Sequence, residues 1–338
     1  MWKTPWRRRS AGRGSWVGRS TTGGGHGGVP LSQFSWASIQ SVEVLERSRA
    51  ARFRPELRDV LLGYFGIRRG MQVLDVGCGP GTFTEYLAAA VAPGEVTGLD
   101  LDEEFVAYAQ AKAANREGAH ARYVVGDAYA LPFEEASFDA VTSYTGIGVL
   151  TEPLKAVAEM VRVCRPGGSV SIAEGVSGPG GITFYGVDGT ERPEPFPGAR
   201  RLAELVRRLR SGRGDAIPGI GSAAWPRQAL WALLASLGLE ELQLNAWGHV
   251  IAPDDHRVGA DLRGQLRAES FDELRQWVSW LLGGHGSSAL SQEELQEILA
   301  LGERRRLWAE DHPLWDWDGG LSIVASARKP DRPRGTRS

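Results

Sequence analysis

The most informative part of the chain is residues 73–82, which read Val73-Leu74-Asp75-Val76-Gly77-Cys78-Gly79-Pro80-Gly81-Thr82. A short apolar run ends here in a glycine-rich segment, and a helical pattern follows. This order predicts a buried strand over 72–76, a tight turn, and a helix over 82–92. Glycines let a ligand approach the main chain closely, and a helix N-terminus favours an anionic group. Thr82 and Glu85 also predict a capping box at the helix start.

The spacing of the glycines separates two kinds of cofactor. Loops that bind the pyrophosphate of a dinucleotide read G-x-G-x-x-G, whereas Gly77, Gly79 and Gly81 give G-x-G-x-G and Thr82 takes the sixth position. Asp75 lies two residues before the first glycine, where a carboxylate suits an ammonium group and not a pyrophosphate. The pattern therefore favours a cofactor with an amino-acid end over a nicotinamide dinucleotide.

Outward from this turn, strand patterns and helix patterns alternate along the chain. Such alternation predicts an α/β fold in which helices cover both faces of a parallel sheet. Helical patterns also cover residues 35–64. Further strands are expected at 95–101, 121–126, 138–143, 169–174, 239–251 and 321–327. Further helices are expected at 103–116, 153–164, 199–210, 226–237, 271–282 and 292–309.

In this order of motifs the chain resembles the class I S-adenosylmethionine-dependent methyltransferases, in particular small-molecule enzymes of the ubiquinone and menaquinone methyltransferase type. The run from Leu74 to Gly81 looks like the first motif of that family. Matching segments continue in order over roughly residues 55–175, namely Gly98-Leu99-Asp100-Leu101-Asp102, Gly126-Asp127-Ala128, Leu131-Pro132-Phe133, Ser137-Phe138-Asp139 and Arg162-Val163-Cys164-Arg165-Pro166-Gly167-Gly168. The resemblance implies a doubly wound, Rossmann-like α/β fold, with a seven-stranded, mostly parallel sheet and helical insertions.

The resemblance also implies S-adenosyl-L-methionine as cofactor and a set of residues that bind it. Asp75 and the glycine turn would hold the amino-acid end, Asp100 would accept from both ribose hydroxyls, and Asp127 would accept from the adenine amino group. Cys78 is expected to be a small buried loop residue and not a nucleophile. The expected cofactor-binding residues are Asp75, Gly77, Cys78, Gly79, Gly81, Asp100, Leu101, Asp127, Ala128 and Ser143.

The sequence identifies the residues that would act on the acceptor less clearly than those that would bind the cofactor. Methyl transfer from a sulfonium is an in-line displacement, so the protein mainly aligns and desolvates the reactants. Some acceptors also need a general base, for which the candidates are Tyr144, Glu174 and His249. Each also has a structural interpretation, as a packing residue, a solvated strand-end acid or a buried histidine. The fourth strand ends in Ser143-Tyr144-Thr145-Gly146, without the Asn/Asp-Pro-Pro of amide and base methyltransferases, which disfavours that chemistry.

Composition and charge limit which binding partners and which cellular compartment can be expected. The 338 residues are 42% hydrophobic, which is ordinary for a globular protein. Residues 1–30 hold six basic residues and no acid, so a disordered basic tail is expected over 1–34. Without these six charges the formal net charge of −2 becomes −8, and an acidic folded part argues against a nucleic-acid partner. Two cysteines and no apolar run of membrane-spanning length predict a cytoplasmic protein without a membrane span.

One methyltransferase domain is expected over residues 35–328, followed by a polar tail over 329–338. Its parts would be N-terminal helices at 35–66, a cofactor-binding core at 67–175, and insertions at 176–224 and 253–318, the second forming a helical lid. Aromatic residues in the insertions, among them Trp277 and Trp280, fit a subdomain core or the wall of an apolar acceptor pocket. No metal site is expected, because Asp254-Asp255-His256 is a single short loop and the other histidines are scattered.

The leading functional hypothesis is a methyltransferase with a small, largely apolar acceptor. Three alternatives stay open: a protein that binds the cofactor without catalysis, a nucleic-acid methyltransferase, and a nicotinamide dehydrogenase. The sequence names neither the acceptor atom nor the oligomeric state.

Overall fold

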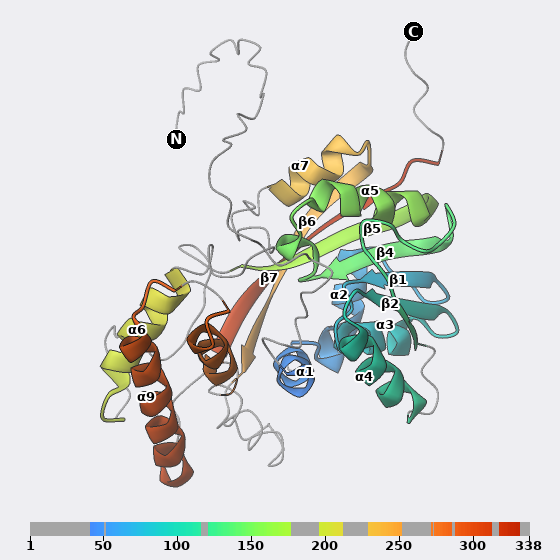
Figure 1. Ribbon diagram of the computed structural model, residues 1–338. Coiled ribbons are helices and arrows are strands. Elements are labelled where there is room, and N and C mark those ends of the chain that lie inside the picture. Colours follow the sequence, from blue (N-terminus) through green and yellow to red (C-terminus); the bar gives the residue numbers. More distant parts are fainter. Residues whose placement is uncertain are drawn as a thin grey trace, which may run out of the picture.

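The computed structural model describes residues 41–50, 52–115, 121–176, 196–211, 229–251, 272, 274–285, 288–312 and 318–331. At its centre is a seven-stranded sheet of order β3-β2-β1-β4-β5-β7-β6 (Figure 1). Its strands are β1 (Gln72–Val76), β2 (Glu95–Asp100), β3 (Ala121–Val125), β4 (Phe138–Tyr144), β5 (Cys164–Val176), β6 (Glu240–Ile251) and β7 (Asp318–Arg328). The expected tail over 1–34, much of both insertions and the loop 254–256 lie outside the described residues.

The sheet is doubly wound around β1. The chain runs from β1 through β2 to β3 at one edge and then returns to β4 on the other side of β1, and all these strands and β5 pair in parallel. β7 pairs antiparallel with β5, and β6 pairs antiparallel with β7. This arrangement confirms the predicted α/β, mostly parallel, seven-stranded fold. Because the winding reverses between β1 and β4, the carboxyl ends of these two strands form the topological switch point, where such folds bind ligands.

Helices cover both faces of the sheet. On one face, α5 (Pro153–Val163) and α7 (Ala229–Ser236) pack against residues such as Val141 and Ile172. On the other face, α2 (Arg58–Phe65) and α3 (Thr82–Val91) pack against residues such as Val73 and Ala140. α4 (Glu103–Ala114) lies beside α3 and packs on β2 and β3. Strands buried on both faces need apolar side chains at nearly every position, which explains why β1 reads as a continuous apolar run around Asp75.

The start of α3 differs from the predicted capping box. Gly81 is the N-cap, in a left-handed conformation with φ of +83°, and no side chain caps the helix. Thr82 is already the first helical residue, so its hydroxyl cannot take the N-cap position. The glycine turn therefore sets the helix start through its backbone, because only glycine adopts positive φ at little cost. β5 also begins at Cys164, five residues earlier than predicted.

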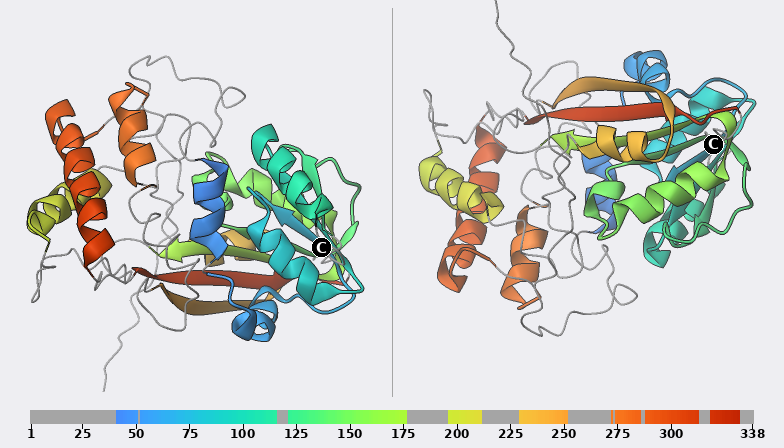
Figure 2. Two further views of the ribbon diagram at one scale, coloured as in Figure 1. Left: turned by 90° about the horizontal axis from the view of Figure 1, so that it is seen from below. Right: turned by 90° about the horizontal axis from the view of Figure 1, so that it is seen from above.

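The described parts of the two expected insertions pack into one helical group. It consists of α6 (Ala199–Ser211), the helical residues 274–282, and α9 (Gln292–Asp311), which share the buried side chains of Leu205, Val278 and Ile298. Figure 2 shows this group at one end of the molecule, with α1 (Val42–Ala50) between it and the helices α3 and α4. None of the described helices has both the length and the apolar character needed to cross a bilayer.

Candidate functional site

The turn after β1 has three positions whose backbone conformation favours glycine. Gly77, Gly79 and Gly81 have φ values of +74°, +54° and +83°. A Cβ on Gly81 would lie 2.6 Å from the hydroxyl oxygen of Tyr123, and one on Gly77 would lie 3.3 Å from the Cα of Gly146. The turn thus combines a left-handed backbone with close packing against β3 and the loop after β4.

Four backbone N–H groups of the turn donate hydrogen bonds to acceptors within the protein. Gly77 and Cys78 both donate to the carbonyl of Leu99, Gly79 donates to Asp100, and Gly81 donates to the carbonyl of Cys78. The sequence predicts that an anionic group lies at the N-terminus of the following helix, and these four amides belong to the turn before it. Those of Gly77, Cys78 and Gly79 hold the turn against β2, and that of Gly81 donates within the turn.

Asp75 is the buried acid beneath the turn. Its side chain is 1% exposed, and Oδ2 accepts a hydrogen bond of 2.7 Å from the hydroxyl of Thr84 in α3. Oδ1 has no hydrogen-bond partner among the described residues. Burial raises the pKa of Asp75 to about 7, and the neighbouring Asp100 adds to this effect. One carboxylate oxygen is therefore left to accept from a cationic donor on a ligand.

Asp100 ends β2 beside the turn. Its Oδ2 accepts from the N–H of Gly79 at 2.7 Å, and its Oδ1 accepts from the N–H of Asp102 at 3.0 Å. Burial raises the pKa of this carboxyl, and the two backbone hydrogen bonds oppose the shift. Each oxygen keeps capacity for a second donor, as binding of two vicinal hydroxyls requires. The next residue, Leu101, is 52% exposed and offers an apolar surface to a flat ring.

Two more of the expected cofactor residues follow β3. Asp127 is exposed, and its Oδ1 accepts from the N–H of Tyr129 at 2.8 Å. The N–H of Gly126 donates to the carbonyl of Asp100 at 2.9 Å, which holds this loop next to the end of β2. Ala128 is half-buried and packs on the edge of the apolar core.

The last expected contact comes from β4. Ser143 is fully buried, and its hydroxyl has no hydrogen-bond partner among the described residues. The same hydroxyl would lie 2.9 Å from a Cβ on Gly146 and 4.0 Å from one on Gly77. Ser143 thus lies near the end of β4, close to the turn that follows β1. Cys78 is buried against Val106 and Tyr123, and burial raises its thiol pKa well above the ordinary range, as suits a packing residue.

Three residues that support the turn carry no motif in the sequence. Tyr123 of β3 packs under it, and its hydroxyl donates to the carbonyl of Gly81 at 3.4 Å. Lys112 of α4 donates to the carbonyl of Pro80 at 3.1 Å and forms ion pairs with Glu46 and Glu85. Arg49 of α1 donates to Thr145 Oγ1 at 3.2 Å, directly after β4. Their distance along the chain from residues 73–82 explains why sequence reasoning missed them.

The three candidate bases come from three different strands, β4, β5 and β6. Tyr144 is 4% exposed and packs among the rings of Phe53, Phe83 and Trp247 in edge-on and tilted arrangements. Its hydroxyl oxygen lies 3.4 Å from that of Ser322. This environment is that of a packing residue. Glu174 Oε1 accepts from the N–H of Gly148 at 2.8 Å and so holds the short helix Ile147–Val149. His249 pairs with Gly320 in the ladder of β6 and β7, at the rim of the sheet.

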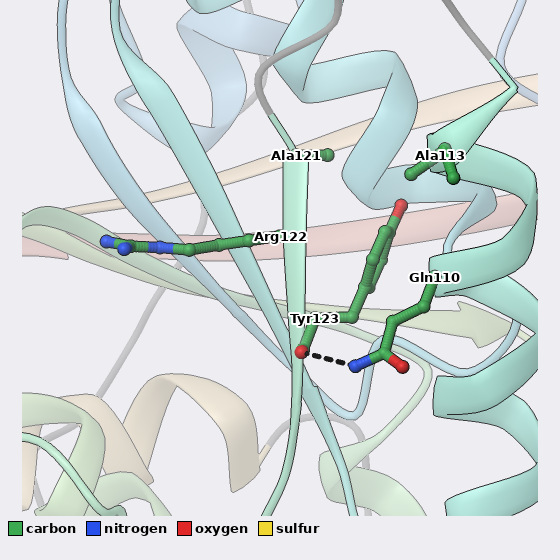
Figure 3. A pocket seen from close by; sticks show the side chains of 6 residues that line it. Gln110, Ala113, Ala121, Arg122 and Tyr123 are labelled. Atoms are coloured by element: carbon green, nitrogen blue, oxygen red, sulfur yellow. Dashed lines mark hydrogen bonds between the residues drawn. The ribbon is translucent and has the colours of Figure 1, made fainter.

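A separate hollow lies at the outer edge of the sheet, between β3 and α4. Figure 3 shows Gln110 and Ala113 of α4 facing Tyr123, with the Gln110 side chain donating to the Tyr123 carbonyl at 3.0 Å. Arg122 extends from the other side of β3. Its lining includes Ala121 to Tyr123, the first three residues of β3, and so lies at the opposite end of that strand from the switch point. Within the described part of the chain, no three His, Cys, Asp or Glu side chains gather as metal ligands.

These residues fit a cofactor with an adenosine and an amino-acid end. Asp75, whose Oδ1 has no donor among the described residues, Asp100, which can accept two hydroxyls, and the exposed side chain of Leu101 lie in succession along the ends of β1 and β2. These three residues therefore lie at the carboxyl edge of the parallel strands.

Comparison with known proteins agrees with this geometry. Residues 73–168 match the model of a methyltransferase domain family. Over 110 residues the chain is 44% identical to the demethylmenaquinone methyltransferase of Staphylococcus aureus strain JH9, which is 32% of this chain and 45% of that protein. The chain thus matches less than half the length of this relative.

Solved structures with lower identity also align with the chain. One is phosphoethanolamine N-methyltransferase 2 of Haemonchus contortus in complex with S-adenosyl-L-methionine, with 17% identity, a TM-score of 0.45, and coverage of 82% of this chain and 53% of that one. Another is a SAM-dependent methyltransferase of Aquifex aeolicus, with 21% identity, a TM-score of 0.40, and coverage of 61% and 92%. The sequence match thus makes residues 73–168 of this chain similar to a methyltransferase domain, and this segment runs from Val73 in β1 through β4 of the sheet.

Proposed function

We propose that this chain transfers a methyl group from S-adenosyl-L-methionine to a small, largely apolar acceptor with a quinone-like ring. The observation that carries the proposal is the meeting of Asp75, the glycine turn and Asp100 at the switch point between β1 and β4. The choice of acceptor class draws on the similarity to a demethylmenaquinone methyltransferase over 110 residues.

The chain's own residues would bind and align the reactants. Asp75 would accept from the ammonium group, Asp100 from the ribose hydroxyls, and Asp127 with Leu101 would hold the adenine. When bound, the cofactor supplies a methyl group on a sulfonium. In the transfer, the acceptor's nucleophilic atom forms a bond to the methyl carbon as the carbon–sulfur bond breaks. The electron pair of that bond stays on sulfur, and the acceptor loses a proton to a base or to water.

The position of the helical group supports a role as a lid. β5 ends at Val176, β6 ends at Ile251 and β7 begins at Asp318, and strand pairing puts these three points at the same rim. This rim is the carboxyl end of the parallel strands, where the cofactor residues lie. A lid there would exclude water from the site of methyl transfer and form one wall of the acceptor-binding pocket. His249 and Glu174, near the same rim, are proposed as the groups that could take a proton.

Calorimetry and a labelled-methyl assay test the proposal in two steps. We expect S-adenosylhomocysteine to bind and NAD not to bind. With methyl-labelled cofactor and a reduced demethylated naphthoquinone that carries a short prenyl chain, we expect label in the organic phase, and less label with the Asp100→Ala protein when the cofactor is limiting. Binding without label in that acceptor or in a metabolite extract would make the chain a cofactor-binding protein. Label in RNA or DNA would make it a nucleic-acid methyltransferase. Either result would overturn the proposal.

A further inference from the structure

Arg49 links the N-terminal helix to the switch point. It lies in the last turn of α1, half-buried, and its Nη2 donates to the hydroxyl of Thr145 at 3.2 Å. Thr145 follows β4 directly and has a φ of +57°. On the same helix, the Leu45 side chain would lie 3.9 Å from a Cβ on Gly79. α1 therefore packs beside the glycine turn and extends Arg49 across the carboxyl ends of the central strands.

The positive charge of Arg49 acts on both acids of the site. Burial is the main influence on the carboxyls of Asp75 and Asp100 and raises both pKa values, and the positive charge of Arg49 opposes this shift at each of them. The guanidinium and the two carboxylates thus share one region beside the turn. Charges of opposite sign in one partly buried region suit a zwitterionic ligand, whose ammonium and carboxylate need opposite partners.

A ligand carboxylate at this turn needs a donor from another element. The amides of Gly77, Cys78, Gly79 and Gly81 all donate to acceptors within the protein, and Pro80 has no N–H. Asp75 and Asp100 lie beside the turn and would repel an anion. The first turn of α3 offers a ligand carboxylate the partial positive charge of a helix N-terminus. Arg49 offers it a full positive charge and N–H groups that can donate to both carboxylate oxygens.

We propose that Arg49 binds the α-carboxylate of the cofactor's amino-acid end, while Asp75 accepts from its ammonium group. This inference rests on the proposed function, since it needs a cofactor of that chemistry. It makes α1 part of the cofactor site. The other end of α1 is tied to the helical group, because the N–H of Ser41 donates to Gln276 Oε1 at 2.7 Å and Gln276 Nε2 donates to Ser41 Oγ at 3.2 Å.

Two ligands that differ only in the carboxylate test the assignment. S-adenosylhomocysteine carries it, and the decarboxylated analogue keeps the sulfur, the amine and the adenosine. For Arg49→Gln we expect the affinity for S-adenosylhomocysteine to fall about tenfold or more, as for loss of a charged hydrogen bond. The affinity for the analogue should stay the same or rise, because its lone ammonium no longer faces a cation. Arg49→Lys keeps the positive charge but not the paired N–H donors of the guanidinium. It should therefore lose less affinity for S-adenosylhomocysteine than Arg49→Gln.

The matched control is Arg54→Gln, since Arg54 lies in the next loop with a 55% exposed side chain paired to Glu56. It should bind both ligands like the wild type. An equal loss of both ligands in Arg49→Gln would make Arg49 a purely structural residue, and no loss of S-adenosylhomocysteine would remove it from the site. Either result overturns the inference. If the wild-type protein bound neither ligand, the proposed function itself would fail, which these variants distinguish from an error about Arg49.

Discussion

The hydroxyl of Thr84, in the first turn of α3, donates a 2.7 Å hydrogen bond to Asp75 Oδ2 at the end of β1. This contact fixes the orientation of a carboxylate that is 1% exposed, and its Oδ1 has no donor within the part of the chain that the structure describes. The strand and the helix that flank the glycine turn are thereby joined beneath it. We expect the protonation state of Asp75 to affect both cofactor binding and stability.

Cofactor affinity should depend on pH through Asp75. Burial raises the pKa of its carboxyl to about 7, so the group is largely protonated at pH 5.5 and largely ionised at pH 8. An ammonium group binds the ionised form better. We expect the affinity for S-adenosylhomocysteine to rise between pH 5.5 and 7.5, approaching about tenfold per unit at the acid end. Calorimetry at several pH values measures this, and Asp75→Asn should show a much flatter profile. Equal profiles for the two proteins would contradict the role of Asp75.

The stability of the ligand-free protein should show the opposite dependence on pH. The pKa of Asp75 is about 7 in the folded state and about 3.9 in the unfolded chain. The folded state therefore binds more protons between these values, so this group favours folding most at the acid end. Its contribution is lost as pH rises toward 7. Urea unfolding of the wild type between pH 5 and 7.5 should show it, and Asp75→Asn should remove that part of the slope. A slope that is unchanged in the variant would show that Asp75 ionises freely in the fold.

Asp100 should contribute to cofactor affinity through the ribose. Its two oxygens each accept one backbone N–H and can each accept one hydroxyl. We expect Asp100→Ala to weaken S-adenosylhomocysteine binding by more than about 1 kcal/mol, because hydrogen bonds to a charged acceptor are lost. Unlike Arg49→Gln, it should weaken the decarboxylated analogue by the same factor, since both ligands carry the ribose. Asp59→Ala, at an exposed position in α2, is the control. Unchanged affinity in Asp100→Ala would refute the assignment.

The glycine turn should not tolerate a side chain at Gly81. Alanine there would adopt a φ of +83° and place its Cβ 2.6 Å from the Tyr123 hydroxyl oxygen. We expect Gly81→Ala to lower the free energy of unfolding by about 2 kcal/mol, from backbone strain together with the steric clash, and to lower cofactor affinity. Thermal unfolding and calorimetry measure the two effects.

Gly63→Ala is the matched control for that substitution. Gly63 lies within α2, and a Cβ there has no neighbour within 4 Å. Alanine should therefore stabilise the helix by about 0.5–1 kcal/mol. If Gly81→Ala were as stable as Gly63→Ala, the left-handed turn would not be a requirement of the fold.

The short-range features of the site were predictable from the sequence. The expected strand over 72–76 and the turn with its three glycines agree with the structure, because apolar runs and positive φ are local properties of the chain. The positions of Asp75 and Asp100 at adjacent strand ends follow from the parallel alternation of strands and helices. The capping box at Thr82 was wrong, because a glycine in a left-handed conformation took the N-cap position that the pattern assigned to a side chain.

What the sequence determined by itself is the order of elements and the residues at each strand end, since both depend on local periodicity and turn chemistry. Only the tertiary structure placed Arg49, Lys112 and Tyr123 around the turn, because they reach it from α1, α4 and β3 through packing between distant segments. It also decided that four amides of the turn donate within the protein and that Asp75 Oδ1 has no donor among the described residues. Such hydrogen bonds depend on which side chains burial brings together, and no pattern within residues 73–82 encodes them.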